Sequence, residues 1–565
     1  MDSNGVIFQT EEGKNNPITE SLLSAGGQKL VENYQRVLDH LKPRGEIATV
    51  HVDEIASKVA LLYEKVRKII DWKEEHLIRR GAIERVLKRR LISEMSRQKL
   101  IPIPNVDPHK AAEPMVLELI RGGHFTNDKI PQAKIGEVEK VLRKYIYILE
   151  NNPLYGSANI KDKINLYNWL LEVAASEIED TLEPPLKENL LINFMTETIL
   201  EGIRVAPGTD LSEEEKRLQT YIAVHRALFH LDAPLISYHL IKYRYFPNWT
   251  NMEEAQLEKI TKNITDLRKR IEDDLAHPFS SHFQKICEKY DTVYLILGDI
   301  LEKLSDHPET ISETFSDPAL LEPQVKKSYD ERLSTLKSRL TRAAIYSTLS
   351  IFVAGAFSLF VIEVPLAKLF YGKFSPLAVL VDILIPTAVM FLLVIIIKPP
   401  GEENFTRVVK ETNKIVYKSE EKDIYEIKAR KKKGWIISLT IGLLYALTSL
   451  ISMALVFWIF QIARVPVTSL YIDTLNVAMI VFAALIIRQR AKEMIIEEKT
   501  SFSQFFLDVL SIPVAKLGQW LSVKWKEYNI VSVFFTAIVD IPFLTITEFI
   551  ESWSNFLKEK KAEIR

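Results

Sequence analysis

Four long apolar stretches follow one another in the second half of the chain and are arranged as two hairpins. We expect them to form membrane spans near residues 343–362, 376–397, 435–462 and 470–487. The third stretch contains no Asp, Glu, Lys or Arg, although a span needs only ~20 apolar residues to cross ~30 Å of hydrocarbon. The pattern therefore predicts an integral membrane protein with several spans.

Tryptophans mark the predicted boundaries of the membrane. Trp435 and Trp458 lie in the third stretch, and a helix rising ~1.5 Å per residue separates them by roughly 34 Å. That distance places the two indoles in opposite aromatic belts. Trp520, Trp525 and Trp553 are the corresponding predicted interface anchors in the C-terminal segment.

The first half of the chain is polar, and its apolar residues recur with helical spacing. Residues 1–28 are rich in small polar side chains and predict a disordered segment. Between Val52 and Ile69, apolar residues alternate steps of three and four, which is typical of a coiled-coil seam or a long bundle helix. We therefore assign residues 29–112 to a long helical, coiled-coil-like region that ends in a group of prolines.

Residues 113–324 predict a helical domain. Helical runs are expected at Ile135–Leu149, Ile164–Ile178 and Leu186–Ile203, separated by Pro, Gly and Asn. Ser212 and Glu215 have the spacing of a capping box at the start of another helix. Because no convincing alternating strand pattern is present, the predicted fold class is all-α.

The last helix of this domain is expected to continue into the membrane. Val325, Tyr329, Leu333, Leu336 and Leu340 form one apolar stripe, and the first span follows without a helix breaker. A rigid stalk is therefore predicted at the start of a membrane domain that covers residues 325–500.

Charge predicts the orientation of this domain. The loop 398–434 carries many Lys and Arg residues, including the run Arg430–Lys433, and a second basic cluster, Arg488–Lys492, follows the fourth span. The loops on the opposite side, 363–375 and 463–470, are short and contain few cations. The positive-inside rule then predicts a multi-pass protein of the cell membrane with both the N-terminal domain and the C-terminus in the cytoplasm.

The C-terminal segment 501–565 combines apolar faces with interspersed lysines and tryptophans, which favours amphipathic helices that lie in the headgroup region or re-enter the membrane. Residues 530–550 are long enough for a fifth span, but they contain Asp540, Pro542 and Glu548. We therefore favour an interfacial or re-entrant element there.

An acidic residue precedes a proline at each predicted membrane turn or break. Glu363, Asp382, Asp508 and Asp540 are the four acids. A carboxylate within the membrane is costly unless it is paired, and a proline leaves a nearby carbonyl without its helical donor, so the pair is a candidate cation or proton site. The alternative is that these acids are ordinary polar groups at helix ends, and Asp382 is the strongest of the candidates because it lies inside its span.

No cofactor is predicted. All eleven His and the single Cys precede residue 310, which argues against a haem, zinc or iron–sulfur site within the spans. His225, His230 and His239 surround Asp232 in the sequence, but their spacing does not favour a metal site. The basic stretch Arg79–Arg97 is interrupted by acids, so an ion-paired helix face is expected there and nucleic acid is not an expected partner.

Two functional classes are compatible with the sequence. In the first, the protein is a non-enzymatic anchor or scaffold whose cytoplasmic helical domain binds a protein partner and whose spans contact the lipid bilayer and, in a homo-oligomer, one another. In the second, the spans form an oligomeric channel or transporter that uses the intramembrane acids. No catalytic motif was found, so an enzyme ranks last.

Overall fold

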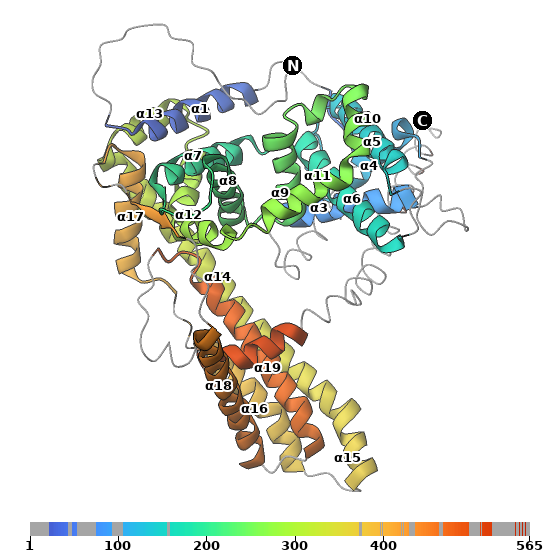
Figure 1. Ribbon diagram of the computed structural model, residues 1–565, viewed down its shortest axis with the longest axis vertical. Helices are drawn as coiled ribbons and strands as arrows, with labels where there is room; N and C mark the ends of the chain where they lie inside the picture. The colour runs from blue at the N-terminus through green and yellow to red at the C-terminus, as the bar shows by residue number, and fades with distance from the viewer. Residues whose placement is uncertain are drawn as a thin grey trace.

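The computed structural model describes residues 22–42, 48–52, 75–92, 106–154, 159–371, 376–395, 397, 399–419, 421, 423–428, 435–462, 467–496, 509 and 511–521, with isolated positions 549, 553, 556 and 560 in the tail. These residues are mostly helical, as the sequence predicts. A helical domain lies at one end of the molecule, and a narrower stem of long helices extends from it (Figure 1).

The domain is built from short and medium-length helices. Its first helices are α1 (Ala25–Leu41), α3 (Glu75–Ile92), α4 (Pro108–Arg121), α5 (Ala133–Asn151), α6 (Ile160–Leu182) and α7 (Leu186–Gly202). They are followed by α8 (Glu213–Phe229), α9 (Ala233–Leu240), the π-helical turn η1 (Ile241–Tyr245), the 3-10 turn η2 (Trp249–Asn251), α10 (Glu254–Lys262), α11 (Ile264–Leu275), α12 (Ser280–Lys303) and α13 (Glu309–Ser316).

The expected helical runs fall within α5, α6 and α7, and the predicted capping box opens α8. The Ser212 side chain accepts from the Glu215 main-chain N–H at 3.2 Å, and the Glu215 carboxylate accepts from the Ser212 N–H at 2.8 Å. The predicted seam of the coiled-coil-like region falls mostly on residues 53–74, which lie outside the described residues. The predicted boundary at residues 112 and 113 falls inside α4.

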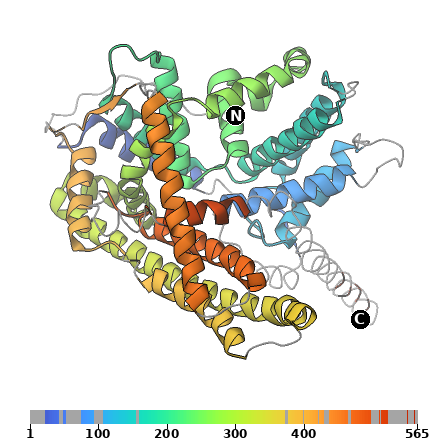
Figure 2. The ribbon, with the colours of Figure 1, turned by 60° about the horizontal axis from the view of Figure 1, so that its bottom comes forward.

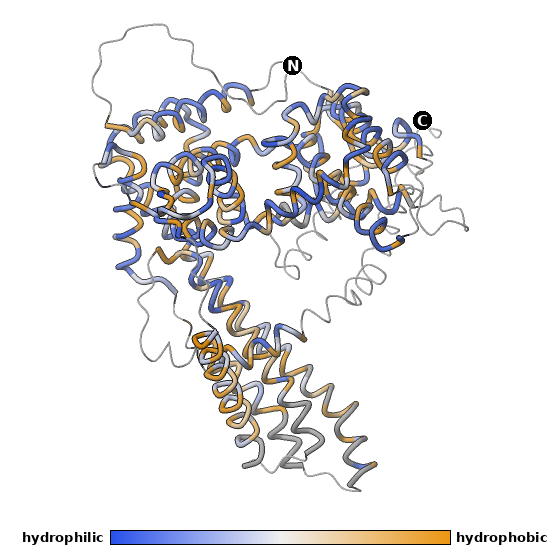
Figure 3. Tube along the Cα trace, viewed as in Figure 1, coloured by the Kyte–Doolittle hydropathy of each residue, from blue (hydrophilic) through white to orange (hydrophobic). Residues whose placement is uncertain are grey.

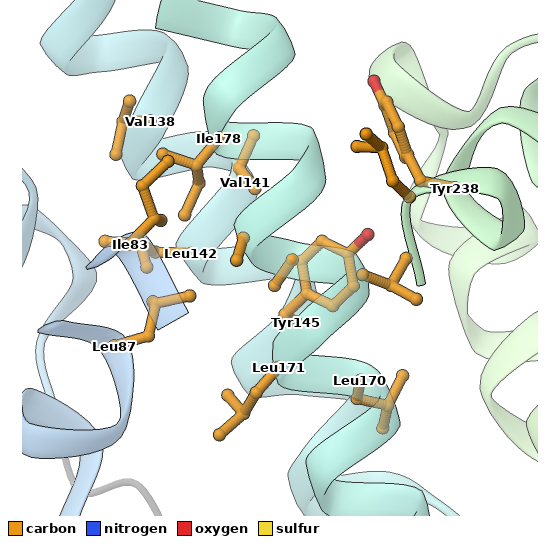
Figure 4. Close-up of a cluster of buried hydrophobic side chains, with 14 of the residues drawn as sticks. Ile83, Leu87, Val138, Val141, Leu142, Tyr145, Leu170, Leu171, Ile178 and Tyr238 are labelled. Carbon is orange, nitrogen blue, oxygen red and sulfur yellow. The ribbon is translucent and has the colours of Figure 1, made fainter. Parts of the chain in front are cut away.

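One hydrophobic core lies in the part of the domain farther from the stem, which we call the distal lobe. It is formed by α3, α4, α5, α6, α9, α10 and α11. Figure 4 shows Ile83 of α3 close to Val138 and Leu142 of α5 and to Ile178 of α6. Burial of such apolar side chains contributes most of the stability of a helical lobe.

A second hydrophobic core lies where the domain meets the stem, and we call this part the proximal lobe. It combines α1, α7, α8, α12 and α13 with the start of α14 and with segments that come later in the chain. Helix α8 is shared between the lobes, because Leu218 and Ile222 belong to the distal core, and Val224 and Leu228 belong to the proximal core. The shared helix joins the two lobes into one domain.

The stem consists of α14 (Pro318–Ser358), the π-helical turn η3 (Leu359–Glu363), α15 (Val364–Tyr371), α16 (Pro376–Ile395), α18 (Trp435–Ile462) and α19 (Val467–Ala491). Helix α14 starts in the proximal lobe and continues without interruption into the stem, so the predicted continuous helix is present. Its side chains change from polar to apolar along its length (Figure 3). Helix α16 packs against both α14 and α19, and Figure 2 shows the stem helices with the bottom of the molecule turned forward.

Three described helical stretches are long and apolar enough to cross a membrane. They are Pro318–Val361, Trp435–Leu455 and Thr474–Ala491. Helix α16 occupies most of the remaining predicted span at residues 376–397. A small apolar cluster around Ala343, Met390, Ile480 and Ala484 joins α14, α16 and α19.

Candidate functional site at the junction of domain and stem

The segment between α16 and α18 folds onto the proximal lobe. It contains α17 (Glu402–Val416), whose Val408, Thr412 and Val416 are buried in the proximal core. The main-chain N–H of Ser24 donates to the Val416 carbonyl at 2.8 Å, and the N–H of Lys418 donates to the Leu22 carbonyl at 3.0 Å. The start of the described domain is thus joined to a segment that lies almost 400 positions later in the sequence.

The same segment then forms the only strand pair in the described part of the chain. Strand β1 (Ile203–Val205) pairs in parallel with β2 (Tyr425–Ile427), and Arg204 lies opposite Glu426. The sequence shows no convincing strand pattern at either segment. Three residues on each side, separated by more than 200 positions, are too short to show an alternating pattern.

The close approach of this pair depends on a glycine at the end of α7. A methyl group at Gly202 would lie 2.5 Å from the main-chain oxygen of Asp423. Only a residue without Cβ allows the two backbones to come this close.

Asn404, in the first turn of α17, connects three segments of the chain. Its side-chain amide donates to the Met494 carbonyl at 2.6 Å and to the Tyr329 hydroxyl of α14 at 3.1 Å, and its side-chain oxygen accepts from the Ile496 N–H at 3.1 Å. Met494 and Ile496 follow α19 and are buried in the proximal core. A single buried amide therefore pairs main-chain groups after the last stem helix with the helix that begins the stem.

Helix α12 contacts the same segment from the other side. The Thr292 hydroxyl donates to the Glu493 carbonyl at 3.1 Å. The neighbouring Asp291 is buried, and the loss of hydration on burial raises its pKa to about 8. Glu288 and Glu493 add to this effect by repulsion.

An ion pair fastens α14 to α12 above the stem. The Arg332 guanidinium donates to both carboxylate oxygens of Asp299, one of them at 2.7 Å. A bidentate pair of this kind fixes the relative orientation of the guanidinium and the carboxylate as well as their distance. The first stem helix is therefore held in a defined orientation relative to the domain.

The distal lobe contains a buried polar network. Glu177 is fully buried and accepts from the Lys144 ammonium at 2.5 Å, from the Tyr145 hydroxyl at 2.8 Å and from the Trp249 indole N–H at 2.8 Å. The Lys144 ammonium also donates to the Trp249 carbonyl at 2.9 Å. Because every group in it is paired, the network ties η2 to α5 and α6, which is a structural role.

The distal lobe also has a small hollow of about 260 Å³ between α6, α9 and α11. Glu172 and Arg268 line it together with Trp169 and Ser237. Burial raises the pKa of Glu172.

The predicted intramembrane acids are only partly placed by the structure. Asp382 lies in α16 and Glu363 ends η3, while Asp508 and Asp540 lie outside the described residues. Pro386 stands four positions after Asp382 in the same helix. A proline has no N–H, so the main-chain carbonyl of Asp382 loses its helical donor.

The predicted tryptophan anchors are exposed wherever they are described. Trp435 begins α18 and Trp458 lies near its end, and their exposed fractions are 76% and 58%. Trp520 is 58% exposed, and Trp553 lies between Phe549 and Phe556 in the tail. Trp525 lies outside the described residues.

The histidines named in the sequence have separate local environments. His225 is fully buried and stacks on His239, with ring centroids 4.7 Å apart. His230 ends α8 in a left-handed conformation, and Asp232 caps α9 and pairs with Arg80. No group of three or more possible metal ligands occurs among the residues that the structure describes.

The predicted ion pairing of the basic stretch is confirmed for its described part. Arg80 and Lys88 pair with Glu84, and Arg90 pairs with Glu118 of α4 at 2.7 Å. Helix α3 is nevertheless partly buried, so its charged side chains join neighbouring helices and do not form a fully solvated face.

The residues of the junction were not predicted from the sequence. Nothing in the sequence around Asn404, Thr292 or Glu493 marks a contact between these segments. The amphipathic pattern of residues 402–416, with Asn404 near its start, was the available signal. Comparisons with known protein families, with curated proteins and with solved structures found no match.

Proposed function

We propose that this protein is a four-span membrane anchor that holds a partner-binding helical domain at the cytoplasmic face in a fixed orientation. The observation that carries the proposal is the composition of the proximal core. Side chains from before the first stem helix, from between α16 and α18, and from after α19 pack in this one core. A domain on a flexible tether would not need such an arrangement.

The shared core supports the four-span arrangement. If α14 crosses the bilayer, the chain must return before α17 reaches the domain, and α16 supplies a returning helix of 20 residues. The same reasoning makes α18 and α19 a second hairpin, because Met494 is again in the proximal core. The basic residues of the 398–434 loop and Arg488–Lys492 then favour the cytoplasm for the whole domain.

The distal lobe is the part of the domain that we propose binds a protein partner. Ile160 and Ile164 stand one turn apart on α6, with exposed fractions of 44% and 45%. Exposed apolar neighbours of this kind favour contact with another protein.

Site-specific photocrosslinking in intact membranes tests the proposal. A photoreactive residue at Ile164 is expected to capture one defined protein, whereas the same residue at Ile345, which is 59% exposed on the stem part of α14, is expected to capture lipid. Absence of a defined product at Ile164, with ion flux through the reconstituted protein, would contradict the anchor function.

An oligomeric channel or transporter is the second candidate, and Asp382 favours it. Asp382 carries a carboxylate, and its main-chain carbonyl lacks a helical hydrogen-bond donor. It belongs to α16, the helix that packs against both α14 and α19. In liposomes loaded with a pH-sensitive or cation-sensitive dye, flux that disappears in Asp382→Asn would establish this function. No flux from either form would remove its main support.

A further inference from the structure

The hollow between α6, α9 and α11 has a polar lining that extends from the surface into the distal lobe. Its α6 side combines the carboxylate of Glu172, the indole of Trp169 and the side-chain amide of Asn168. Trp169 and Ser237 of α9 are buried, whereas Asn165 is exposed. A group that enters past Asn165 therefore meets a carboxylate and an aromatic ring.

The size of the hollow matches a single side chain. Pockets that hold drug-sized ligands measure about 300–1,000 Å³, and this hollow measures about 260 Å³. It is too small for a larger cofactor, but it can hold the end of one long side chain.

The charges of the lining favour a cation. The Nε of Arg268 donates to the carboxylate of Glu272 at 2.7 Å, so the positive charge of Arg268 is offset within the lining. The carboxylate of Glu172 has lost part of its hydration, and this burial raises its pKa. A cation in the hollow would compensate for the hydration that the Glu172 carboxylate has lost.

The charged groups behind Glu172 pair with one another. Arg80 pairs with Asp232, and Lys88 pairs with Glu84 at 2.6 Å. Desolvation is the largest cause of the raised pKa of Glu172, and these surrounding charges partly offset one another. The Glu172 carboxylate therefore remains the acidic group that an entering cation meets.

A guanidinium group suits this lining better than an ammonium group. It is planar and weakly hydrated, so it loses less on partial burial, and it both stacks on aromatic rings and pairs with a carboxylate through two N–H groups. Trp169 and Glu172 supply the ring and the carboxylate. The side-chain oxygen of Asn168 supplies a further acceptor.

An apolar surface adjoins the hollow on the same helix. Ile164 precedes Asn168 by four positions and Glu172 by eight, so the three residues share one side of α6. Ile160 stands one turn before Ile164, and both are more than two-fifths exposed. The combination suits a protein segment in which an arginine lies beside an apolar residue.

We propose that the hollow binds the guanidinium group of an arginine side chain in a partner protein. Glu172 pairs with this group, Trp169 contacts its face, and Ile164 contacts an apolar neighbour in the partner segment. This inference rests on the proposed partner-binding function of the distal lobe, and it names the chemistry that the partner presents.

Isothermal titration calorimetry of the full-length protein in detergent tests the site, with N-acetyl-arginine amide as the probe. N-acetyl-citrulline amide has nearly the same shape without the charge and is the matched ligand control. We expect saturable binding of the arginine probe, about tenfold weaker binding of the citrulline probe, and an intermediate affinity for N-acetyl-lysine amide.

Glu172→Gln should weaken binding of the arginine probe by about tenfold, because it removes the charge that pairs with the guanidinium group. It should not lower the melting temperature, because a partly buried charge is lost at the same time. Asp273→Asn, an exposed change on α11 outside the hollow, is the matched control and should leave binding unchanged.

Three results would overturn the site. They are equal affinity for the arginine and citrulline probes, equal affinity of wild type and Glu172→Gln for the arginine probe, and no binding of the arginine probe to wild type. Lysine binding as tight as arginine binding would contradict the preference for a guanidinium group.

Photocrosslinking at Ile164 in the Glu172→Gln background separates this inference from the proposed function. The yield of the partner product should fall clearly below that of the protein with Glu172 in place. An unchanged yield would contradict arginine recognition and would still support partner binding by the distal lobe. Binding of the arginine probe without any partner product at Ile164 would support the site and contradict partner binding.

Discussion

The side-chain amide of Asn404 donates a 2.6 Å hydrogen bond to the main-chain carbonyl of Met494, which lies 90 positions later. The chain between them contains the rest of α17, strand β2 and the two helices α18 and α19. The bond joins the segment after α19 to the first turn of α17, so it ties the end of the second hairpin to the helical domain.

Replacement of Asn404 by Ala should weaken the attachment of the segment after α19 to the helical domain. The Met494 carbonyl and the Ile496 N–H would be left buried without a partner, and each such group costs about 1–3 kcal/mol. We expect a clear fall in melting temperature in detergent and faster proteolysis after α19. Asn263→Ala, which removes an exposed hydrogen bond to the Lys259 carbonyl, is the control and should change little.

The buried carboxyl of Asp291 should make stability depend on pH. Its pKa is about 8 in the folded chain against an ordinary value of 3.8, so the folded state keeps this proton where the unfolded state has lost it. The contribution to stability is greatest below pH 3.8, falls as the pH rises to about 8, and is constant above that.

We therefore expect the melting temperature to fall between pH 5 and pH 8, by a smaller amount in Asp291→Asn. Burial also raises the pKa of Glu179 to about 8, so its contribution to stability falls over the same pH range. Glu179→Gln should therefore remove another part of the fall in melting temperature. Asp162→Asn, an exposed change on α6, is the control. A slope that is unchanged in both buried variants would contradict this explanation.

Loss of Lys144 should destabilise the distal lobe more than loss of the whole ion pair. Lys144→Met leaves the fully buried Glu177 carboxylate without its cation, which typically costs about 3–5 kcal/mol. The double variant Lys144→Met/Glu177→Gln keeps an acceptor for Tyr145 and Trp249 without a buried charge. Chemical denaturation should show that the double variant is more stable than Lys144→Met alone.

The strand pair should depend on Gly202. A methyl group there would collide with the Asp423 main-chain oxygen, so Gly202→Ala should lower the melting temperature and expose the connection between α17 and α18 to protease. Gly136→Ala in α5 is the matched control, because no heavy atom lies within 4 Å of the added methyl group. In an open helical position this change should stabilise the protein by about 0.5–1 kcal/mol. Loss of stability in both variants, or in neither, would contradict the role of the close approach.

The regular elements could be predicted from the sequence because their signals are local. Ser212 and Glu215 mark a helix start within four residues, and the uncharged run from Trp435 to Ile462 matches α18 from end to end. The stripe from Val325 to Leu340 continues into the stem as one helix because no Pro or Gly interrupts it before Ala343. The spacing of apolar residues and the positions of helix-breaking Pro and Gly were sufficient to predict these helices.

The junction could not be predicted because its contacts are distant in sequence. The loop 398–434 had served only as a basic marker of orientation, although Val408 and Val416 fill part of the domain core. Thr292 and Glu493 are separated by 201 positions. A single sequence records no such pairing, and three-residue strands produce no periodic signal.

The central claim is that the domain and the segment between α16 and α18 lie on one side of the membrane and in direct contact. Paired cysteines at Arg204 and Glu426, which lie opposite each other in the β1–β2 pair, test it most directly. With Cys287 replaced by Ala, mild oxidation in sealed membrane vesicles should join the two positions, whereas a control pair at Asp162 and Glu426 should stay reduced. Before oxidation, an impermeant thiol reagent should reach both positions from the same side. Labelling of the two positions from opposite sides, or no disulfide in folded protein, would contradict the account.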